Sequence, residues 1–78
     1  MKISFRTIDD IISFTQFTEK LEHSNIDLKR GNQYLDGKSF LGLANVSVNA
    51  EYEVSIITSN LDEKERFEKY ITNWERRN

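Results

Sequence analysis

The apolar residues of this chain change their spacing along its length, and this change constrains the fold more than any other feature. The stretch 2–7 alternates apolar and polar residues, as a strand with one buried face does. The stretch 11–21 instead repeats apolar residues at helical spacing. A helix should therefore follow the first strand directly, capped by Thr7 or Asp9. Its expected core stripe consists of Ile11, Phe14, Thr18 and Leu21, flanked by Ile12 and Phe17.

The two spacings continue to alternate toward the end of the chain. Turns are expected at 23–25 and 30–32. The further elements that we expect are a strand at 26–29, a strand at 33–35, a helix at 40–46 and a strand that carries Tyr52, Val54 and Ile56. The last helix opens with capping-box spacing at 60–63, a polar cap followed three residues later by a carboxylate. Its apolar face would carry Phe67, Tyr70, Ile71 and Trp74, with Arg76 and Arg77 at its negative end.

The resulting order of elements is β-α-β-β-α-β-α. Four short strands with three helices on one face make an α+β open-faced sandwich, in which apolar strand residues meet the stripes of the first and last helices. A chain of 78 residues has room for one domain, 1–78, and a domain of this size buries only about 60% of its unfolded surface. Its stability should therefore be modest.

Composition excludes several classes of function. No cysteine is present, so we expect neither a disulfide framework nor a thiolate metal site. The net charge is −2 with acidic and basic residues intermixed, which argues against nucleic acid as a partner, because a phosphate backbone favours a basic face. The sequence holds no apolar run of membrane-spanning length and no leader of signal-peptide type. We therefore expect a cytoplasmic protein without membrane contact, metal or cofactor.

The stretch 36–43 carries the most functional information. Asp36-Gly37 is a turn signal, and Ser39 is a good helix N-cap because its hydroxyl can accept a hydrogen bond from a free N–H group of the first turn. Phe40 and Leu41 follow at once. Two bulky apolar residues directly after a cap cannot both face one core, so we expect them to be at least partly exposed.

This stretch resembles HPr, the histidine-containing phosphocarrier protein of the bacterial sugar phosphotransferase system, in which a Lys-Ser pair opens the short second helix. Val54–Thr58 is similar to that family's fourth strand and Leu61–Lys64 to the acidic start of its last helix, and the likeness covers about 25–74, and more loosely 2–21. It implies an antiparallel sheet ordered 1-4-2-3 and Ser39 as a regulatory phosphorylation site. It also implies a partner-binding surface made of Lys38, Phe40, Leu41 and Ala44, together with Phe17 and Ile12 of the first helix.

The chain departs from the family where phosphotransfer would occur. HPr carries its histidine, with an arginine and a proline, in a loop between the first strand and first helix. Here Thr7-Ile8-Asp9-Asp10 runs almost directly from strand to helix, and the two aspartates would repel a phosphoryl group. The single histidine, His23, falls at the other end of that helix and is interpreted as a solvated loop residue. Ser47 and Glu51 stand where the family has glycines, so that loop should be rebuilt.

Three functions remain open. The preferred one is an HPr-like regulatory module that is no enzyme, carries no phosphate on histidine and binds proteins through the Ser39 helix. Its partners would be phosphotransferase components, a serine kinase or a transcriptional regulator. The second is a phosphocarrier with an unrecognised acceptor, such as an aspartate. The third is a small structural or oligomerising domain with this fold and no phosphotransferase role, since fold does not determine function. The chain should be a monomer or a weak homo-oligomer.

Overall fold

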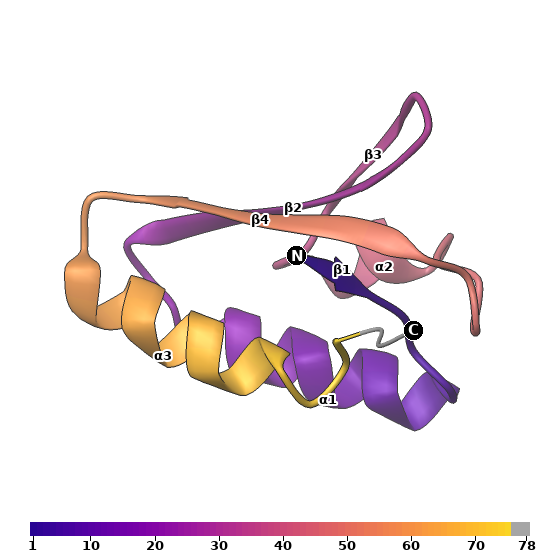
Figure 1. The fold of residues 1–78 in the computed structure, drawn as a ribbon, viewed down its shortest axis with the longest axis horizontal. Coiled ribbons are helices and arrows are strands. Elements are labelled where there is room, and N and C mark those ends of the chain that lie inside the picture. Colours follow the sequence, from indigo (N-terminus) through magenta and orange to yellow (C-terminus); the bar gives the residue numbers. More distant parts are fainter. Residues whose placement is uncertain (76–78) are drawn as a thin grey trace.

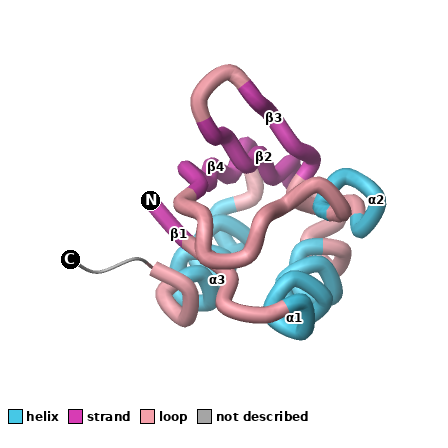
Figure 2. The backbone as a smooth tube through the Cα atoms, turned by 90° about the vertical axis from the view of Figure 1, so that its right-hand side faces the viewer, coloured by secondary structure: helices cyan, strands magenta, loops and turns pink. Residues whose placement is uncertain are grey.

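The computed structural model describes residues 1–75, and at Phe40 it describes the backbone alone. Four strands form one antiparallel sheet in the order β1-β4-β2-β3. Helices α1 and α3 lie side by side under the sheet, and α2 lies beside its β3 end (Figures 1 and 2). The α+β open-faced fold and the sheet order are therefore confirmed. The elements are β1 (Lys2–Ile3), α1 (Ile8–Thr18), β2 (Ser24–Arg30), β3 (Gln33–Asp36), α2 (Phe40–Leu43), β4 (Tyr52–Thr58) and α3 (Leu61–Ile71).

Strand β1 is shorter than the alternation at 2–7 predicts. After Ile3 the chain leaves the sheet, and the N–H of Ser4 donates to the carbonyl of Trp74 at 3.1 Å rather than to β4. The carbonyl of Phe5 accepts from the N–H of Asn49 at 2.6 Å. These partners lie far away in the sequence, so the alternation of side chains cannot reveal them.

Two other boundaries also differ from the sequence prediction. Strand β2 begins at Ser24, inside the turn predicted at 23–25, because Ser24 and Asn25 pair with Thr58 and Ile57 of β4. Helix α2 ends at Leu43 instead of residue 46. Its last turn tightens, since the N–H of Ala44 bonds to the carbonyl of Leu41, three residues back.

The core stripe predicted for α1 is confirmed. Ile11, Phe14, Thr18 and Leu21 are all buried, and Phe14 is fully so. Its ring meets Phe5 edge-on at 5.2 Å between centroids and Trp74 at 5.6 Å. The rest of the buried apolar core consists of Ile3, Ile26, Leu28, Leu43, Tyr52, Val54, Phe67 and Ile71.

Two residues predicted for the apolar face of the last helix are only half-buried. Helix α3 ends at Ile71, so Trp74 lies in the following turn and covers the core from its edge. Tyr70 stacks on Phe17 with 3.7 Å between ring centroids and donates its O–H to the carbonyl of Ser13 at 3.2 Å. Burial raises the pKa of Tyr70, and the nearby negative charge of Asp10 adds to the effect. Arg76 and Arg77, predicted to face the helix dipole, lie outside the described residues.

The capping box predicted at 60–63 forms in one half only. The side chain of Asn60 accepts the N–H of Glu63 at 3.0 Å, as an N-cap does. The N–H of Asn60, however, donates to the hydroxyl of Thr58. The buried Glu63 carboxylate instead accepts the Ser24 O–H at 2.6 Å and the His23 N–H at 3.1 Å. It therefore ties α3 to the start of β2, and the Ser24 hydrogen bond is the main reason that the pKa of Glu63 is lowered, against the effect of its burial.

Replacing Glu63 with glutamine is expected to lower Tm at about pH 7, because the ionised carboxylate that holds His23 and Ser24 is lost. A carboxyl group whose pKa is lowered on folding stabilises the folded state above its ordinary pKa of 4.5. That stabilisation disappears as the pH falls through the folded pKa. The difference in Tm between the native chain and Glu63→Gln should therefore shrink below about pH 4.5, as followed by circular dichroism. Glu68→Gln, exposed on the same helix, is the matched control, and a difference independent of pH would contradict the assignment.

Candidate docking surface on helices α1 and α2

Ser39 begins α2 as predicted. Its backbone is extended, and its hydroxyl accepts the N–H of Gly42 at 3.1 Å. The preceding turn is closed by the Asp36 carboxylate, which accepts the N–H of Lys38 at 2.9 Å. Gly37 is buried in this turn, where a β-carbon would come within 2.6 Å of the Ile26 Cγ2 atom. The path of the chain into α2 thus depends on a glycine that passes directly over β2.

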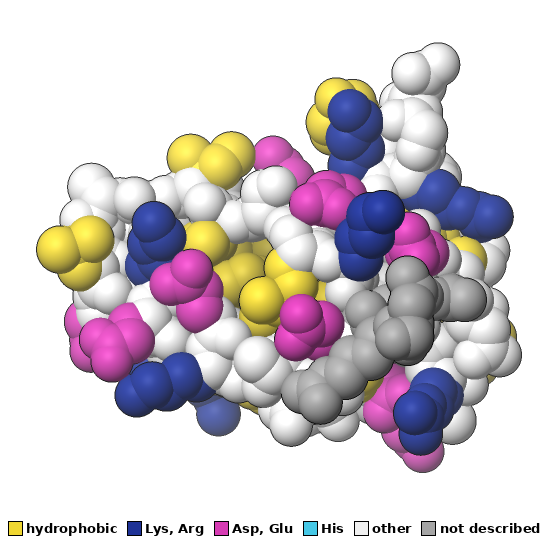
Figure 3. Space-filling model, viewed as in Figure 1, with side chains coloured by type: hydrophobic (Ala, Val, Ile, Leu, Met, Phe, Trp, Pro, Cys, Tyr) yellow, Lys and Arg dark blue, Asp and Glu magenta, His cyan; other side chains and the backbone are white. Residues whose placement is uncertain are grey.

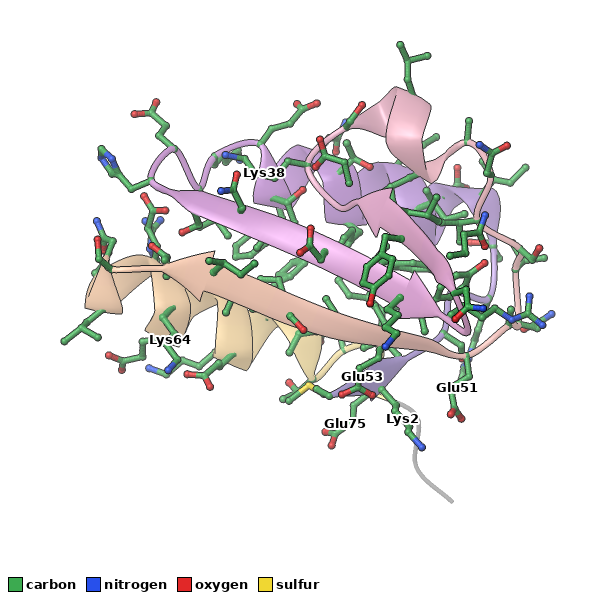
Figure 4. All side chains as sticks on the ribbon, turned by 90° about the horizontal axis from the view of Figure 1, so that it is seen from above. Lys2, Lys38, Glu51, Glu53, Lys64 and Glu75 are labelled. Atoms are coloured by element: carbon green, nitrogen blue, oxygen red, sulfur yellow. The ribbon has the colours of Figure 1, made fainter. Side chains whose placement is uncertain are left out.

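The ammonium group of Lys38 is bound within the domain. Its Nζ donates to the carbonyl of Leu21 at 2.7 Å and to the carbonyl of Ser24 at 3.0 Å. Figure 4 shows this side chain beside the loop that leads into β2. Lys38, which the family resemblance assigns to partner binding, here fastens the start of α2 to the end of the α1–β2 loop. The Lys38 ammonium can contact a partner or a phosphate only if it gives up its hydrogen bonds to the Leu21 and Ser24 carbonyls.

An open apolar hollow lies between the N-terminal half of α1 and α2. Its volume is about 430 Å³, and its lining residues are Ile8, Ile11, Leu43, Ala44, Val46 and Val48. Ile8 is 68% exposed, although it is a large apolar residue, and Leu41, which lies on α2 but does not line the hollow, is 82% exposed. None of the lining residues is charged. We call this hollow together with Leu41 the α1/α2 surface.

The structure brings only some of the predicted binding residues to this surface. Leu41 and Ala44 are exposed and belong to it. Phe17 does not, because it stacks on Tyr70 at the α1–α3 contact. Ile12 is half-buried on α1 and does not line the hollow. The side chain of Phe40, which was expected to be partly exposed, lies outside the described atoms.

Five residues that line the hollow were not predicted as binding residues. Two of them, Ile11 and Leu43, belong to the buried core. The other three, Ile8, Val46 and Val48, are brought together by the contact of α1 with α2 and by the loop that returns to β4. A signal for one of them exists in the sequence, because Val48 is an apolar residue in a predicted loop, outside the periodic stripes of the core. Val46 was placed at the end of the predicted helix 40–46, and only the early end of α2 leaves it in a loop. Ile8 carries no such signal, because an apolar residue in a first helical turn is commonly buried.

The N-terminus of α1 is filled by the chain's own carboxylate. Asp10 Oδ2 accepts the N–H of Arg6 at 2.9 Å and the N–H of Thr7 at 3.3 Å, while the Thr7 hydroxyl accepts the N–H of Asp10. A helix N-terminus binds an anion through such N–H groups. Here the capping box already uses them. The polar hollow beside it, about 500 Å³, is lined by Ser4, Arg6, Asp10, Thr72, Asn73, Trp74 and Glu75.

The other side chains that could take part in phosphate or metal chemistry do not gather at one site. His23 is exposed in the turn that follows α1, at the far end of that helix from Asp10. Among residues 1–75, no group of three histidine, cysteine, aspartate or glutamate side chains lies close enough to hold a metal ion. Within the same residues, no helix combines the length and the apolar character needed to cross a membrane.

Comparison with known proteins gives no relative. No protein-family model matches the chain, and searches of curated proteins and of solved structures each return no match. Membership of the HPr family therefore stays a prediction from the resemblance at 36–43 and in the elements around it. The sheet order that the resemblance implied is present in the structure, but a fold can serve many functions.

Proposed function

We propose that this chain is an HPr-like regulatory module of the cytoplasm that binds proteins through the α1/α2 surface and carries no phosphoryl group on a histidine. The exposure of Leu41 on α2, the helix that also gives Leu43 to the apolar hollow, supports this proposal most strongly. Exposed apolar residues such as Leu41, 82% exposed, and an apolar hollow on the same pair of helices are typical of a surface that another protein covers. The partner is a protein that inserts apolar side chains, because no charged group lines the hollow.

The geometry at the α1 N-terminus supports the absence of phosphocarrier activity. The N–H groups of Arg6 and Thr7, which could donate to a phosphoryl group, already donate to the Asp10 carboxylate. A phosphoryl group placed there would also meet the negative charge of that carboxylate. Partners of the phosphotransferase system would then engage the chain without exchanging phosphate with it.

Ser39 is the proposed point of regulation. A phosphate on this cap would place oxygens near the N–H of Gly42, which the hydroxyl now accepts, and near the positive end of α2. Ser39 is next to Lys38, whose ammonium would have to exchange the Leu21 and Ser24 carbonyls for the phosphate. Added negative charge beside Leu41 would change which partners fit the α1/α2 surface.

Replacing Leu41 with lysine is expected to weaken partner binding at least about tenfold, since burying a leucine contributes about 1.5–3 kcal/mol and each 1.4 kcal/mol is tenfold in affinity. Tm should change little, because the side chain is 82% exposed. The measurement is titration of the isotope-labelled protein with purified phosphotransferase components and with the transcriptional regulator. It follows chemical shifts of α2 and of the N-terminal half of α1.

Leu61→Lys is the matched control, because Leu61 is 77% exposed at the start of α3, a helix that gives no residue to the hollow. Equal weakening by both substitutions, or shifts confined to α3, would contradict docking at the α1/α2 surface.

Incubation of the chain with phosphoenolpyruvate and the general phosphotransferase enzyme should leave its intact mass unchanged. A gain of one phosphate would establish a phosphocarrier and overturn the proposal.

A further inference from the structure

The β2–β3 hairpin reaches beyond the rest of the sheet and carries positive charge (Figure 1). Residues 29–34 at its tip are all exposed, and they include two cations, Lys29 and Arg30, and no acidic residue. Since the whole chain has a net charge of −2, the hairpin carries +2 and the remaining residues carry −4. Figure 3 shows a basic and an apolar side chain, and no acidic one, on its projecting end. The hairpin is therefore complementary to a negatively charged partner.

Both cations lie over aromatic rings rather than beside carboxylates. Within residues 1–75, neither forms an ion pair. Lys29 Nζ is 5.4 Å from the ring centre of Tyr34, which is 66% exposed. Arg30 Cζ is 6.0 Å from the ring centre of Tyr52. Glu53 is the partner of Lys29 on β4, but its carboxylate bonds to the N-terminal ammonium at 3.0 Å. A ring attracts a cation without neutralising its charge, so both cations stay available to the carboxylates of a partner.

Strand β3 lies at one end of the sheet, so one of its sides has no neighbouring strand. The Gly37 N–H donates to the Ile26 carbonyl at 2.7 Å, and hydrogen-bonded pairs alternate along an antiparallel ladder. The N–H and C=O of Tyr34 therefore point away from β2. Those of Asp36 point the same way, but its carbonyl accepts the Ser39 N–H at 3.4 Å, where α2 begins. Helix α2 thus covers the edge at Asp36 and leaves it open at Tyr34.

We propose that the hairpin binds an acidic, extended segment of another protein as an additional antiparallel strand beside β3. One residue of that segment exchanges both of its backbone hydrogen bonds with Tyr34. Its side chain then lies on the same face of the sheet as the Tyr34 ring and the Lys29 ammonium. An aspartate or glutamate at this position pairs with Lys29, while its neighbours along the segment point to the opposite face. This inference does not depend on docking at the α1/α2 surface.

Nucleic acid fits this edge less well than a protein segment does. It has no peptide N–H and C=O to pair with Tyr34, and the negative charge on the rest of the chain repels a long polyanion. The exposed apolar residues at the far end of the sheet lack comparable surroundings. Ile57 is 57% exposed, but its partner on β2 is the uncharged Asn25, and Leu61 is followed by Asp62. The hairpin joins an open edge, an exposed ring and two cations that have no carboxylate partner.

Titration of the isotope-labelled chain with an acidic peptide, followed by amide chemical shifts, tests the proposal. The probe is a capped peptide of about six residues, the length of an average strand, that alternates glutamate with valine. Shifts should concentrate at residues 29–36, with a dissociation constant above about 10 μM, because the contact is far smaller than a stable interface. Raising the salt concentration should weaken binding, since salt screens the attraction. Shifts away from the hairpin, or an affinity independent of salt, would overturn the proposal.

Charge variants test the two cations. Lys29→Gln combined with Arg30→Gln should raise the dissociation constant of the peptide about tenfold, because each exposed ion pair contributes up to about 1 kcal/mol. Lys20→Gln combined with Lys64→Gln makes the same change in net charge at exposed positions outside the hairpin. This control should leave the constant within about twofold. Equal weakening by the two pairs of substitutions would reduce the effect to net charge and overturn the assignment.

Methylated peptides test the strand pairing on the native chain. If a glutamate faces Tyr34, the glutamate N–H groups donate toward β3 and the valine N–H groups point away. The peptide with N-methylated glutamates should therefore lose binding, whereas the peptide with N-methylated valines should keep it. Binding that survives methylation of the glutamates would exclude the proposed strand.

Two further measurements reveal a different occupant. Oligothymidylate that binds the hairpin as tightly as the peptide would show a site for polyanions in general, and it would overturn strand addition. Hairpin shifts that depend on the chain's own concentration, without peptide, would place a second copy at the edge and overturn it as well. We expect neither result. Docking at the α1/α2 surface is followed by shifts of α2 and of the N-terminal half of α1, so failure of either proposal is visible separately.

Discussion

Replacing Phe14 with alanine is expected to produce the largest loss of stability of any single change in this chain, about 3–5 kcal/mol. Phe14 is fully buried and contacts Phe5 and Trp74 edge-on. Alanine would leave a cavity between α1, the chain after β1 and the turn after α3. A domain of this size is stable by roughly 4–12 kcal/mol, so the substitution removes much of the total. Chemical denaturation followed by Trp74 fluorescence measures the change.

Phe17→Ala is the matched control for Phe14→Ala. Both phenylalanines lie on α1, but Phe17 is only half-buried and stacks on Tyr70 rather than filling the core. Its loss should cost less, because part of the ring is already in contact with water. A smaller cost at Phe14 than at Phe17 would show that the aromatic cluster around Trp74 is not the centre of the core.

Replacing Gly37 with alanine is expected to destabilise the chain by about 1–3 kcal/mol, the usual cost of forcing an extra group into a filled space. The added β-carbon would lie within 2.6 Å of the Ile26 Cγ2 atom and 3.1 Å of the Ile26 carbonyl oxygen. The Gly37 N–H also donates to that carbonyl at 2.7 Å. Relief of the clash requires the turn to move away from β2, which shifts α2. Partner binding at the α1/α2 surface should therefore weaken together with Tm.

A double-mutant cycle checks the cause. Ile26→Ala removes the Cγ2 atom that the new β-carbon meets, so the cost of both changes together should be smaller than the sum of the single costs. Strict additivity would show that the clash with Ile26 is not the source of the effect. Gly31→Ala is a poor substitute for this test, since that glycine has a positive φ of 60° and open space around it.

The candidate site could be predicted only in part. Ser39 as a cap followed from its residue type, because an N-cap bond closes within three residues. The exposure of Leu41 followed from the crowding of apolar residues behind that cap and is confirmed. Lys38, by contrast, was assigned to a partner, and the structure binds it to Leu21 and Ser24. A long flexible side chain can reach many acceptors, and only the folded chain selects among them.

By itself, the sequence determined the order of elements and the buried stripe of α1, and it limited the cap of that helix to Thr7 or Asp9, of which the structure uses Thr7. These depend on the spacing of residues along one helix or strand, and hydrophobic burial imposes that spacing locally. The tertiary structure alone decided that Ile8, Val46 and Val48 line one hollow with Leu43. It also decided that Phe17 stacks on Tyr70 and that Glu63 accepts the hydroxyl of Ser24. The physical reason is that each of these contacts joins segments far apart in the chain, whose approach follows from packing the whole core.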